Sequence, residues 1–281
     1  MDYKIIVDSC GELTYKMKES GIYLSAPLSM QVDGDTIMDD ETFDQADFLR
    51  RVAASPECPK SSCPSPEKYM ELYSGEERRV YVVTLSSELS GSFNSAQLAA
   101  KLWKEEHGED GKQIHVFNSR SASVGETLIA CKVRECEEQG MTFDETVSET
   151  EAYIEGQHTY FVLENLDTLR KNGRLTGIKS FVASALNIKP VMGSTPQGTI
   201  CQLGQARGIK RALAKMAEQI ARDSKQTKEK VLAIAHCNCP ERAREVERML
   251  LDIIRVKDSF IVDTAGISTM YANDGGIIVV L

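Results

Sequence analysis

Long apolar runs are missing from this sequence of 281 residues. No apolar run in it approaches the roughly 18 residues that a membrane-spanning helix needs. The N-terminal stretch MDYKIIVDS also lacks the basic, apolar and small-residue regions of a secretory signal peptide, because it begins directly with a strand pattern. We therefore expect a cytoplasmic protein. Its eight cysteines are expected to be free thiols, since disulfides are rare in that compartment.

Signatures of catalysis and metal binding are scarce as well. The chain has only four histidines, and none completes a recognisable Ser-His-Asp pattern. The segment HCNCPE (residues 236–241) groups one histidine with two cysteines, but no further ligands follow at zinc-site spacing, which favours buried strand-end residues. We therefore predict no catalytic residue, no metal and no cofactor.

Charge is distributed unevenly along the chain. The formal net charge of −9 argues against general nucleic-acid binding. Residues 168–217 nevertheless contain no Asp or Glu, which predicts an anionic ligand or an acidic partner, although a solvated helix face would look the same. The nine basic residues of this segment are Arg170, Lys171, Arg174, Lys179, Lys189, Arg207, Lys210, Arg211 and Lys215.

Short apolar strand patterns alternate with helix patterns of period 3.6, which is typical of an α/β protein with mainly parallel pairing in its first half. After residue 157 the pattern changes. The segments IKPVMGS and TICQLGQ flank the turn signal PQG and predict a β-meander or a hairpin. We therefore expect two domains: an N-terminal α/β domain of residues 1–157, and a C-terminal domain of residues 158–281 with a mixed sheet flanked by helices.

The segment TLSSELSGSFNSA (residues 84–96) lies between a strand pattern and a helix pattern. Four of its five serines surround Gly91: Ser86, Ser87, Ser90 and Ser92. Backbone N–H groups at such a loop point toward an anion, and serine hydroxyls can donate to its oxygens. The loop is neither a nucleotide P-loop nor a hydrolase nucleophile elbow. Ser92 or Asn94 could simply cap the helix. The residues alone leave the anion site and the cap as equal alternatives.

Two further segments offer polar side chains. In PKSSCPSPEKY (residues 59–69) the prolines hold the chain extended, and Ser65-Pro66 predicts a helix start. Ser61 and Ser62 lie upstream of that cap and could form a ligand wall or a solvent-exposed loop. In NGR (residues 172–174), Arg174 could stabilise a helix C-terminus or clamp an anion.

Taken in order, these segments resemble the DegV family, the fatty-acid-binding proteins of bacteria, over nearly the whole chain. The LSSxLSG loop followed by KNGR is specific as a pair. The segments that carry the resemblance are VDSCGEL, KSSCPSPEKY, TLSSELSGSFNSA, FNSRSASVGE, LENLDTLRKNGRLTG and ALNIKPV.

The resemblance implies two α/β domains with a long-chain fatty acid in a buried tunnel between or within them. It implies that hydroxyls hold the carboxylate, and the matching positions are Ser61 with its neighbour Ser62, Ser90 and Gly91. It implies that Arg174 belongs to a surface that meets a separate kinase subunit, which uses ATP to convert the bound fatty acid to an acyl phosphate. The protein would then be a lipid carrier without catalysis of its own, and the resemblance leaves room for a transient contact with a membrane.

One position departs from the family pattern. Family members often carry a His-x-Gly-Pro-Gly turn before the last strand, where this chain has YANDGG. Tyr271 stands at the histidine position and Asp274 at the proline position. A histidine can be cationic, whereas a tyrosine donates only a neutral hydrogen bond, so we assign Tyr271 to the carboxylate site in that neutral role.

Two other functions compete with the carrier hypothesis. An enzyme acting on a small anion, such as a hydrolase or phosphotransferase, would need a general base that the sequence does not offer. A regulatory module could use its basic face to bind an acidic protein. A buried acyl chain fits the chain's features because each buried CH₂ contributes about 0.8 kcal/mol, while its carboxylate needs hydrogen-bond donors.

Overall fold

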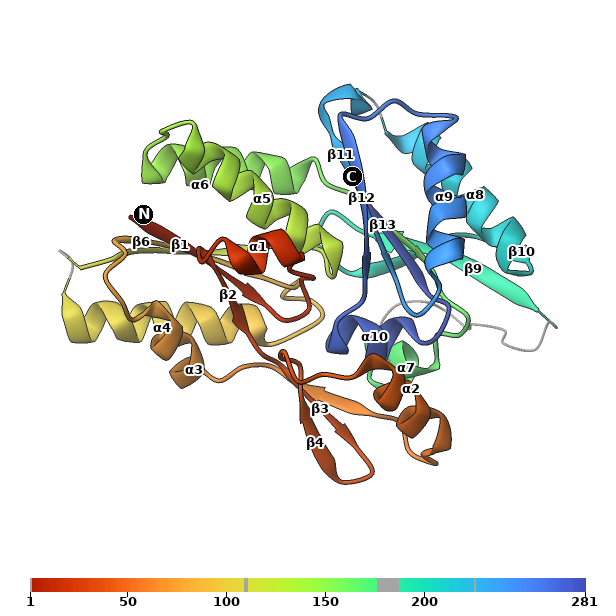
Figure 1. The fold of residues 1–281 in the computed structure, drawn as a ribbon, viewed down its shortest axis with the longest axis horizontal. Helices are drawn as coiled ribbons and strands as arrows, with labels where there is room; N and C mark the ends of the chain where they lie inside the picture. Colours follow the sequence, from red (N-terminus) through yellow and green to blue (C-terminus); the bar gives the residue numbers. More distant parts are fainter. Residues whose placement is uncertain (1, 109–110, 176–186, 225) are drawn as a thin grey trace.

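The computed structural model describes residues 2–108, 111–175, 187–224 and 226–281. Within them the chain forms three sheets flanked by helices (Figure 1). The first sheet is wholly parallel, with the order β2-β1-β6-β7. Its strands are β1 (Tyr3–Asp8), β2 (Tyr23–Ala26), β6 (Arg79–Thr84) and β7 (Gln113–Asn118).

Helices cover both faces of this parallel sheet, because its strands bury both sets of alternating side chains. Ile5 and Val7 pack with Ile129 of one helical layer, whereas Ile6 packs with Tyr69 of the other. The first layer comprises α1 (Tyr15–Glu19), α5 (Val124–Glu138) and α6 (Phe143–Glu155). The second comprises α3 (Pro66–Tyr73) and α4 (Ser92–His107).

The second large sheet has six strands in the order β10-β9-β8-β13-β11-β12. Only β11 and β12 pair in parallel, so the sheet is mixed, and β9 and β10 form the hairpin that the sequence predicted. Its strands are β8 (Thr159–Val162), β9 (Ile188–Ser194), β10 (Ile200–Arg207), β11 (Val231–His236), β12 (Asp258–Asp263) and β13 (Ile277–Val280). The mixed α/β class expected from the sequence is therefore confirmed.

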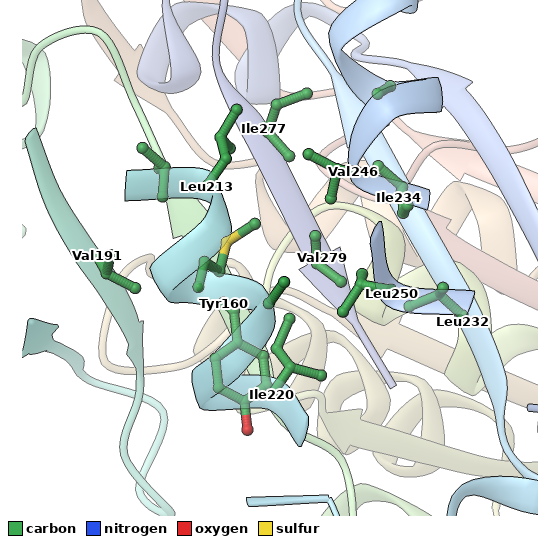
Figure 2. Close-up of a cluster of buried hydrophobic side chains, with 14 of the residues drawn as sticks. Tyr160, Val191, Leu213, Ile220, Leu232, Ile234, Val246, Leu250, Ile277 and Val279 are labelled. Atoms are coloured by element: carbon green, nitrogen blue, oxygen red, sulfur yellow. The ribbon is translucent and has the colours of Figure 1, made fainter. Parts of the chain in front are cut away.

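Two amphipathic helices cover one face of the six-stranded sheet. These are α8 (Ile209–Asp223) and α9 (Pro240–Leu251). Figure 2 shows Leu213 and Ile220 of α8 and Val246 of α9 packed against Ile234 and Val279 of the sheet. The short 3₁₀ helix η1 (Thr227–Glu229) precedes β11. This core leaves the opposite face of the sheet free to meet the N-terminal part of the chain.

The third sheet is small, antiparallel and absent from the sequence-based expectations. It has the order β4-β3-β5, with β3 (Ser29–Val32), β4 (Asp35–Met38) and β5 (Lys60–Ser62). The segment predicted as an extended proline loop is thus partly a strand, because Met30 pairs with Ser61. Helix α2 (Gln45–Ala54) connects β4 to β5. The first half of the chain therefore contains antiparallel as well as parallel pairing.

Side-chain caps mark two helix starts, and the first of them was predicted from the sequence. Ser65 accepts from the Lys68 N–H ahead of Pro66, and Thr142 and Glu145 form a reciprocal capping box. Two short helices complete the fold: α7 (Asp167–Lys171) and α10 (Gly266–Ala272).

The expected domain boundary at residue 157 falls between α6 and β8. All strands of the six-stranded sheet follow that point, whereas the other two sheets precede it. Helix α5 nevertheless packs on β11 and β13 through Val124 and Leu128, so the two halves share buried surface. Division into two separate domains stays a prediction. Most of the small-residue segment LTGIKSFVASALN, including Lys179, lies outside the described residues.

No helix among the described residues is long and apolar enough to cross a membrane.

Candidate functional site

A cavity lies between the carboxyl ends of β1, β6 and β7 and the free face of the six-stranded sheet. Strand alternation explains its lining, since Phe161 borders the cavity while Tyr160 and Val162 point into the core beneath α8. Helix α10, together with Leu169 of α7 and Arg174 after it, borders one end. The apolar part of the lining includes Leu85, Leu89, Phe161, Leu163, Leu169, Ile200, Ile267 and Ile278.

Ser86 fixes the serine-rich loop at the edge of this cavity. It is fully buried, its Oγ donates to the Gly198 carbonyl over 2.9 Å, and its N–H donates to the Ser121 carbonyl over 2.8 Å. The N–H groups of Leu89 and Ser90 in turn donate to the Ser86 carbonyl. Ser86 therefore joins the loop to the β9–β10 turn rather than presenting its hydroxyl to a ligand.

The start of α4 differs from the predicted cap. Gly91 is the N-cap residue and no side chain caps the helix in the usual way, so the prediction of a cap by Ser92 or Asn94 is wrong. The Ser92 hydroxyl is buried and donates to Asp8 Oδ2 over 2.6 Å, because the carboxylate at the end of β1 needs a donor there. Ser90 Oγ accepts from the Ser92 N–H over 3.2 Å.

Ser61 and Tyr271 meet across 210 positions of sequence. Their hydroxyl oxygens lie 2.9 Å apart. Burial raises the pKa of the Tyr271 phenol above its ordinary value of 10, so the group stays neutral and can donate a hydrogen bond. Ser62, the next residue along β5, is exposed. The tyrosine that replaces the family histidine thus lies beside the predicted serine.

Arg174 lies next to this pair. Its Nε donates to the Leu89 carbonyl over 3.1 Å, and its Cζ lies 5.9 Å from the centre of the Tyr271 ring. Asn172 Nδ2 donates to the Pro59 carbonyl over 3.0 Å and so ties the NGR segment to the chain before β5. Gly173 has a φ of 75°, which allows the sharp turn that brings Arg174 back.

Four segments that are distant in sequence therefore converge at one end of the cavity. Among the predicted site residues, Tyr271 and Arg174 line the cavity. Ser61 lies in hydrogen-bond contact with Tyr271, and Ser90 follows the lining residue Leu89. Gly91 is exposed beside Cys63, since a Cβ at Gly91 would lie 3.3 Å from that sulfur. We call this end, formed by Ser61, Tyr271, Arg174, Ser90 and Gly91, the mouth.

Sequence reasoning missed the buried carboxyl groups behind the cavity. Burial raises the pKa of Glu12 to about 7, and burial followed by the charge of Asp8 raises the pKa of Glu126 well above its ordinary value. Ser123, which lines the cavity, donates to Glu12 Oε2 over 2.8 Å. The motif VDSCGEL contains two acids of this cluster, but no pattern in the sequence shows that both become buried.

The HCNCPE segment begins at the end of β11 and contributes buried side chains there. His236 ends β11, with its Nδ1 3.3 Å from Asp263 Oδ1, and Cys237 is buried. No group of three or more His, Cys, Asp or Glu side chains in the described part of the chain is arranged to hold a metal ion.

The remaining lining comes from residues whose types carry no signal. Cys10, Ala122, Ser268 and Ala272 border the cavity, yet residues of these types are ordinary in loops after strands and on buried helices. Their role follows only from the packing of α10 and the loop after β7 against the sheet.

Comparison with known proteins matches both the sequence and the fold of this chain. The model of a family described as "uncharacterised protein, DegV family" matches residues 2–280. A DegV domain-containing protein of Streptococcus pneumoniae is 31% identical over 99% of this chain and 98% of its own length.

Solved structures give the same picture. The crystal structure of a DegV family protein from Ruminococcus gnavus, refined with vaccenic acid, is 64% identical, has a TM-score of 0.97 and covers 100% of both chains. The S. pneumoniae Fatty Acid Kinase (Fak) B3 protein, loaded with linoleic acid, is 31% identical with a TM-score of 0.88, over 100% of this chain and 99% of that one. With its sequence matched over residues 2–280 and its fold matched over the full length, the chain belongs to the DegV family.

Proposed function

We propose that this protein binds a long-chain fatty acid, with the acyl chain in the cavity and the carboxylate at the mouth. The observation that carries the proposal is an apolar cavity that ends at Tyr271 and Arg174. The chain that forms it is 64% identical in sequence to a protein refined with vaccenic acid.

The acyl chain supplies most of the affinity in this proposal. Each CH₂ moved from water into the apolar interior contributes about 0.8 kcal/mol, and the lining from Phe161, Leu163 and Ile278 offers only hydrocarbon. A carboxylate moved to the same depth would lose its hydration at a high cost. The chain therefore enters the cavity and the head group stays at the mouth.

The mouth supplies donors for that head group. The neutral Tyr271 hydroxyl and Ser61 form a ready pair, and the Arg174 guanidinium adds a positive charge over the tyrosine ring. Ser90 and Gly91 lie where α4 starts, and the first N–H groups of a helix favour an anion. The exposed Ser62 hydroxyl completes the donor set that we propose.

We further propose that the bound lipid is presented to a separate ATP-dependent kinase subunit, which forms an acyl phosphate. Support comes from the name of the S. pneumoniae relative, a Fatty Acid Kinase B3 protein. The basic residues Arg170 and Lys171 are exposed on α7, close to Arg174, and would meet an acidic partner surface. The protein itself would then perform no catalysis.

Lipid analysis of the purified protein tests the binding step. Protein expressed in bacteria should release a long-chain fatty acid on denaturation, detected by mass spectrometry of the extract. Added oleate should displace a fluorescent fatty acid from the delipidated protein. Repeated recovery of empty protein that also fails to bind oleate or palmitate would contradict the proposal.

A coupled assay tests the presentation step. A fatty acid kinase subunit with ATP should form acyl phosphate only when lipid-loaded protein is present, and Arg174→Ala should reduce the rate. The exposed basic residue Lys210, on a different helix, provides the matched control as Lys210→Ala. Salt-sensitive binding to an acidic protein without any lipid requirement would instead favour a regulatory module.

A further inference from the structure

Helix α10 forms one wall of the cavity and carries part of the mouth. Four of its seven residues border the cavity: Ile267, Ser268, Tyr271 and Ala272. All of its residues except Tyr271 are buried. The position of this short helix therefore decides where the Tyr271 hydroxyl lies relative to Ser61.

A helix of seven residues is too short to be stable by itself, so its position depends on contacts with other segments. Its N-cap residue, Ala265, offers no side-chain acceptor, so the first N–H groups depend on a partner from elsewhere. Asp39 supplies that partner from the segment after β4. Its Oδ1 accepts from the Gly266 N–H over 2.7 Å, and its Oδ2 accepts from the Ile267 N–H over 2.8 Å.

The contact between Asp39 and the helix is a close fit. A Cβ at Gly266 would lie 2.6 Å from Asp39 Oδ1 and 2.4 Å from Met30 Cε, so only glycine lets the carboxylate approach. Asp39 is 3% exposed, and its own N–H donates to the Leu28 carbonyl. Burial, with a smaller contribution from the charge of Asp8, raises the pKa of Asp39 to about 6. The group is therefore mainly ionised at neutral pH.

The small antiparallel sheet reaches both ends of α10. Asp39 directly follows β4 and binds the start of the helix, while Ser61 of β5 binds Tyr271 near its end. Both strands pair with β3, so the separation between the two anchor points is set by one sheet. Charge-assisted bonds at the first turn are stronger than the neutral bond at the other end.

We propose that Asp39 is a positioning residue for the lipid head group. Its carboxylate holds the first turn of α10, and through this helix it places the Tyr271 hydroxyl against Ser61 at the mouth. The inference rests on the proposed fatty-acid binding. It adds to that site a residue that does not itself line the cavity.

A double-mutant cycle on oleate affinity tests the proposal. Asp39→Asn keeps the shape of the side chain but removes its charge, and we expect it to weaken oleate binding about fivefold to tenfold, in line with loss of one charge-assisted bond. Tyr271→Phe should weaken binding to a similar extent. Because Asp39 acts through the tyrosine, the double variant should bind about as well as Tyr271→Phe alone.

A general loss of structure would give a different result. It would add to the effect of Tyr271→Phe instead of disappearing in its presence. Asp40→Asn is the matched control, since Asp40 is the next residue and its carboxylate accepts from Thr42 in its own turn. It should leave oleate affinity within about twofold of wild type. Additive effects in the cycle, or unchanged affinity of Asp39→Asn, would overturn the proposal.

Hydrogen exchange tests the same contact without a ligand. The peptide containing residues 264–272 should exchange faster in Asp39→Asn, while peptides from β1 and β6 keep their wild-type rates. Gly266→Ala disrupts the same contact from the helix side and should give the same local change in exchange. It provides a second test if Asp39→Asn folds poorly. Unchanged exchange in both variants would refute the role of Asp39 even if oleate binding is established, whereas wild-type protein that binds no fatty acid would refute the proposed function itself.

Discussion

The interior and the mouth of the cavity are built from different kinds of structure. The interior uses strands of the six-stranded sheet, such as β8 with Phe161, whose places are fixed by long ladders of backbone hydrogen bonds. The mouth uses the serine loop, the turn after α7, the short helix α10 and the edge strand β5. These pieces are held mainly by individual side-chain contacts.

The difference separates two requirements of a lipid site. Affinity grows with buried hydrocarbon and needs a stable apolar surface, which a sheet provides. Orientation of the head group needs a few donors at fixed places, which loops can offer when other residues hold them. We therefore expect changes in the interior to alter affinity for the chain, and changes at the mouth to alter preference for the carboxylate.

Filling the interior should have the largest effect on lipid binding. Ala122 lines the cavity, and Ala122→Phe would displace about four CH₂ groups, worth about 3 kcal/mol or roughly a hundredfold in affinity. Fluorescent displacement should show this loss for an 18-carbon acid and a much smaller loss for a 10-carbon acid. Ala53→Phe, on the exposed side of α2, serves as the control. Equal losses for both chain lengths would contradict the assignment of Ala122 to the acyl chain.

A change at the mouth should have a moderate and head-group-specific effect. Ser90→Ala removes a hydroxyl beside the proposed carboxylate and should weaken oleate binding about threefold to tenfold, with less effect on oleyl alcohol. Ser86→Ala should instead lower stability by about 1–2 kcal/mol, because the buried Gly198 carbonyl loses its donor. Thermal unfolding and displacement assays on both variants separate the two roles. Equal affinities of the two variants for oleate would remove Ser90 from the site.

The substitution Glu12→Gln, behind the cavity, should leave the affinity for lipid within about twofold of wild type. Glu12 is fully buried, and burial raises its pKa from 4.5 to about 7. Because the folded-state pKa is the higher one, the neutral acid favours folding below pH 4.5, and this contribution is lost as the pH rises through about 7. The loss is at most about 3 kcal/mol.

Glu12→Gln should therefore stabilise the protein more at pH 8 than at pH 5, because the amide never has to ionise. Denaturant unfolding at the two pH values measures the difference, and the exposed Glu19→Gln is its control. A stabilisation that does not change with pH would show that Glu12 is not the titrating group.

Sequence patterns predicted most strands of the two large sheets, since these strands are apolar runs that differ from the amphipathic helices between them. Strand β2 of the first sheet, with the sequence YLSA, was missed. The strands β3 and β4 were missed because SMQV and DTIM are short and half polar, and they gain their order from pairing with each other and with β5. The start of α4 was predicted wrongly for a related reason. Ser92 has the chemistry of a cap, but the buried Asp8 carboxylate offers its hydroxyl a better partner.

The sequence by itself determined the α/β class, the order of the main elements and the residue types suited to a carboxylate, because periodicity and capping are local properties. Residue chemistry marked Ser61 and Arg174 as separate candidates, and the resemblance to the DegV family singled out Ser90 and Tyr271. Only the tertiary structure decided that Tyr271 meets Ser61, that Arg174 lies over the tyrosine ring, and that Asp39 caps a helix 227 positions away. These contacts join distant segments, and their geometry depends on how the sheets pack, which no local pattern encodes.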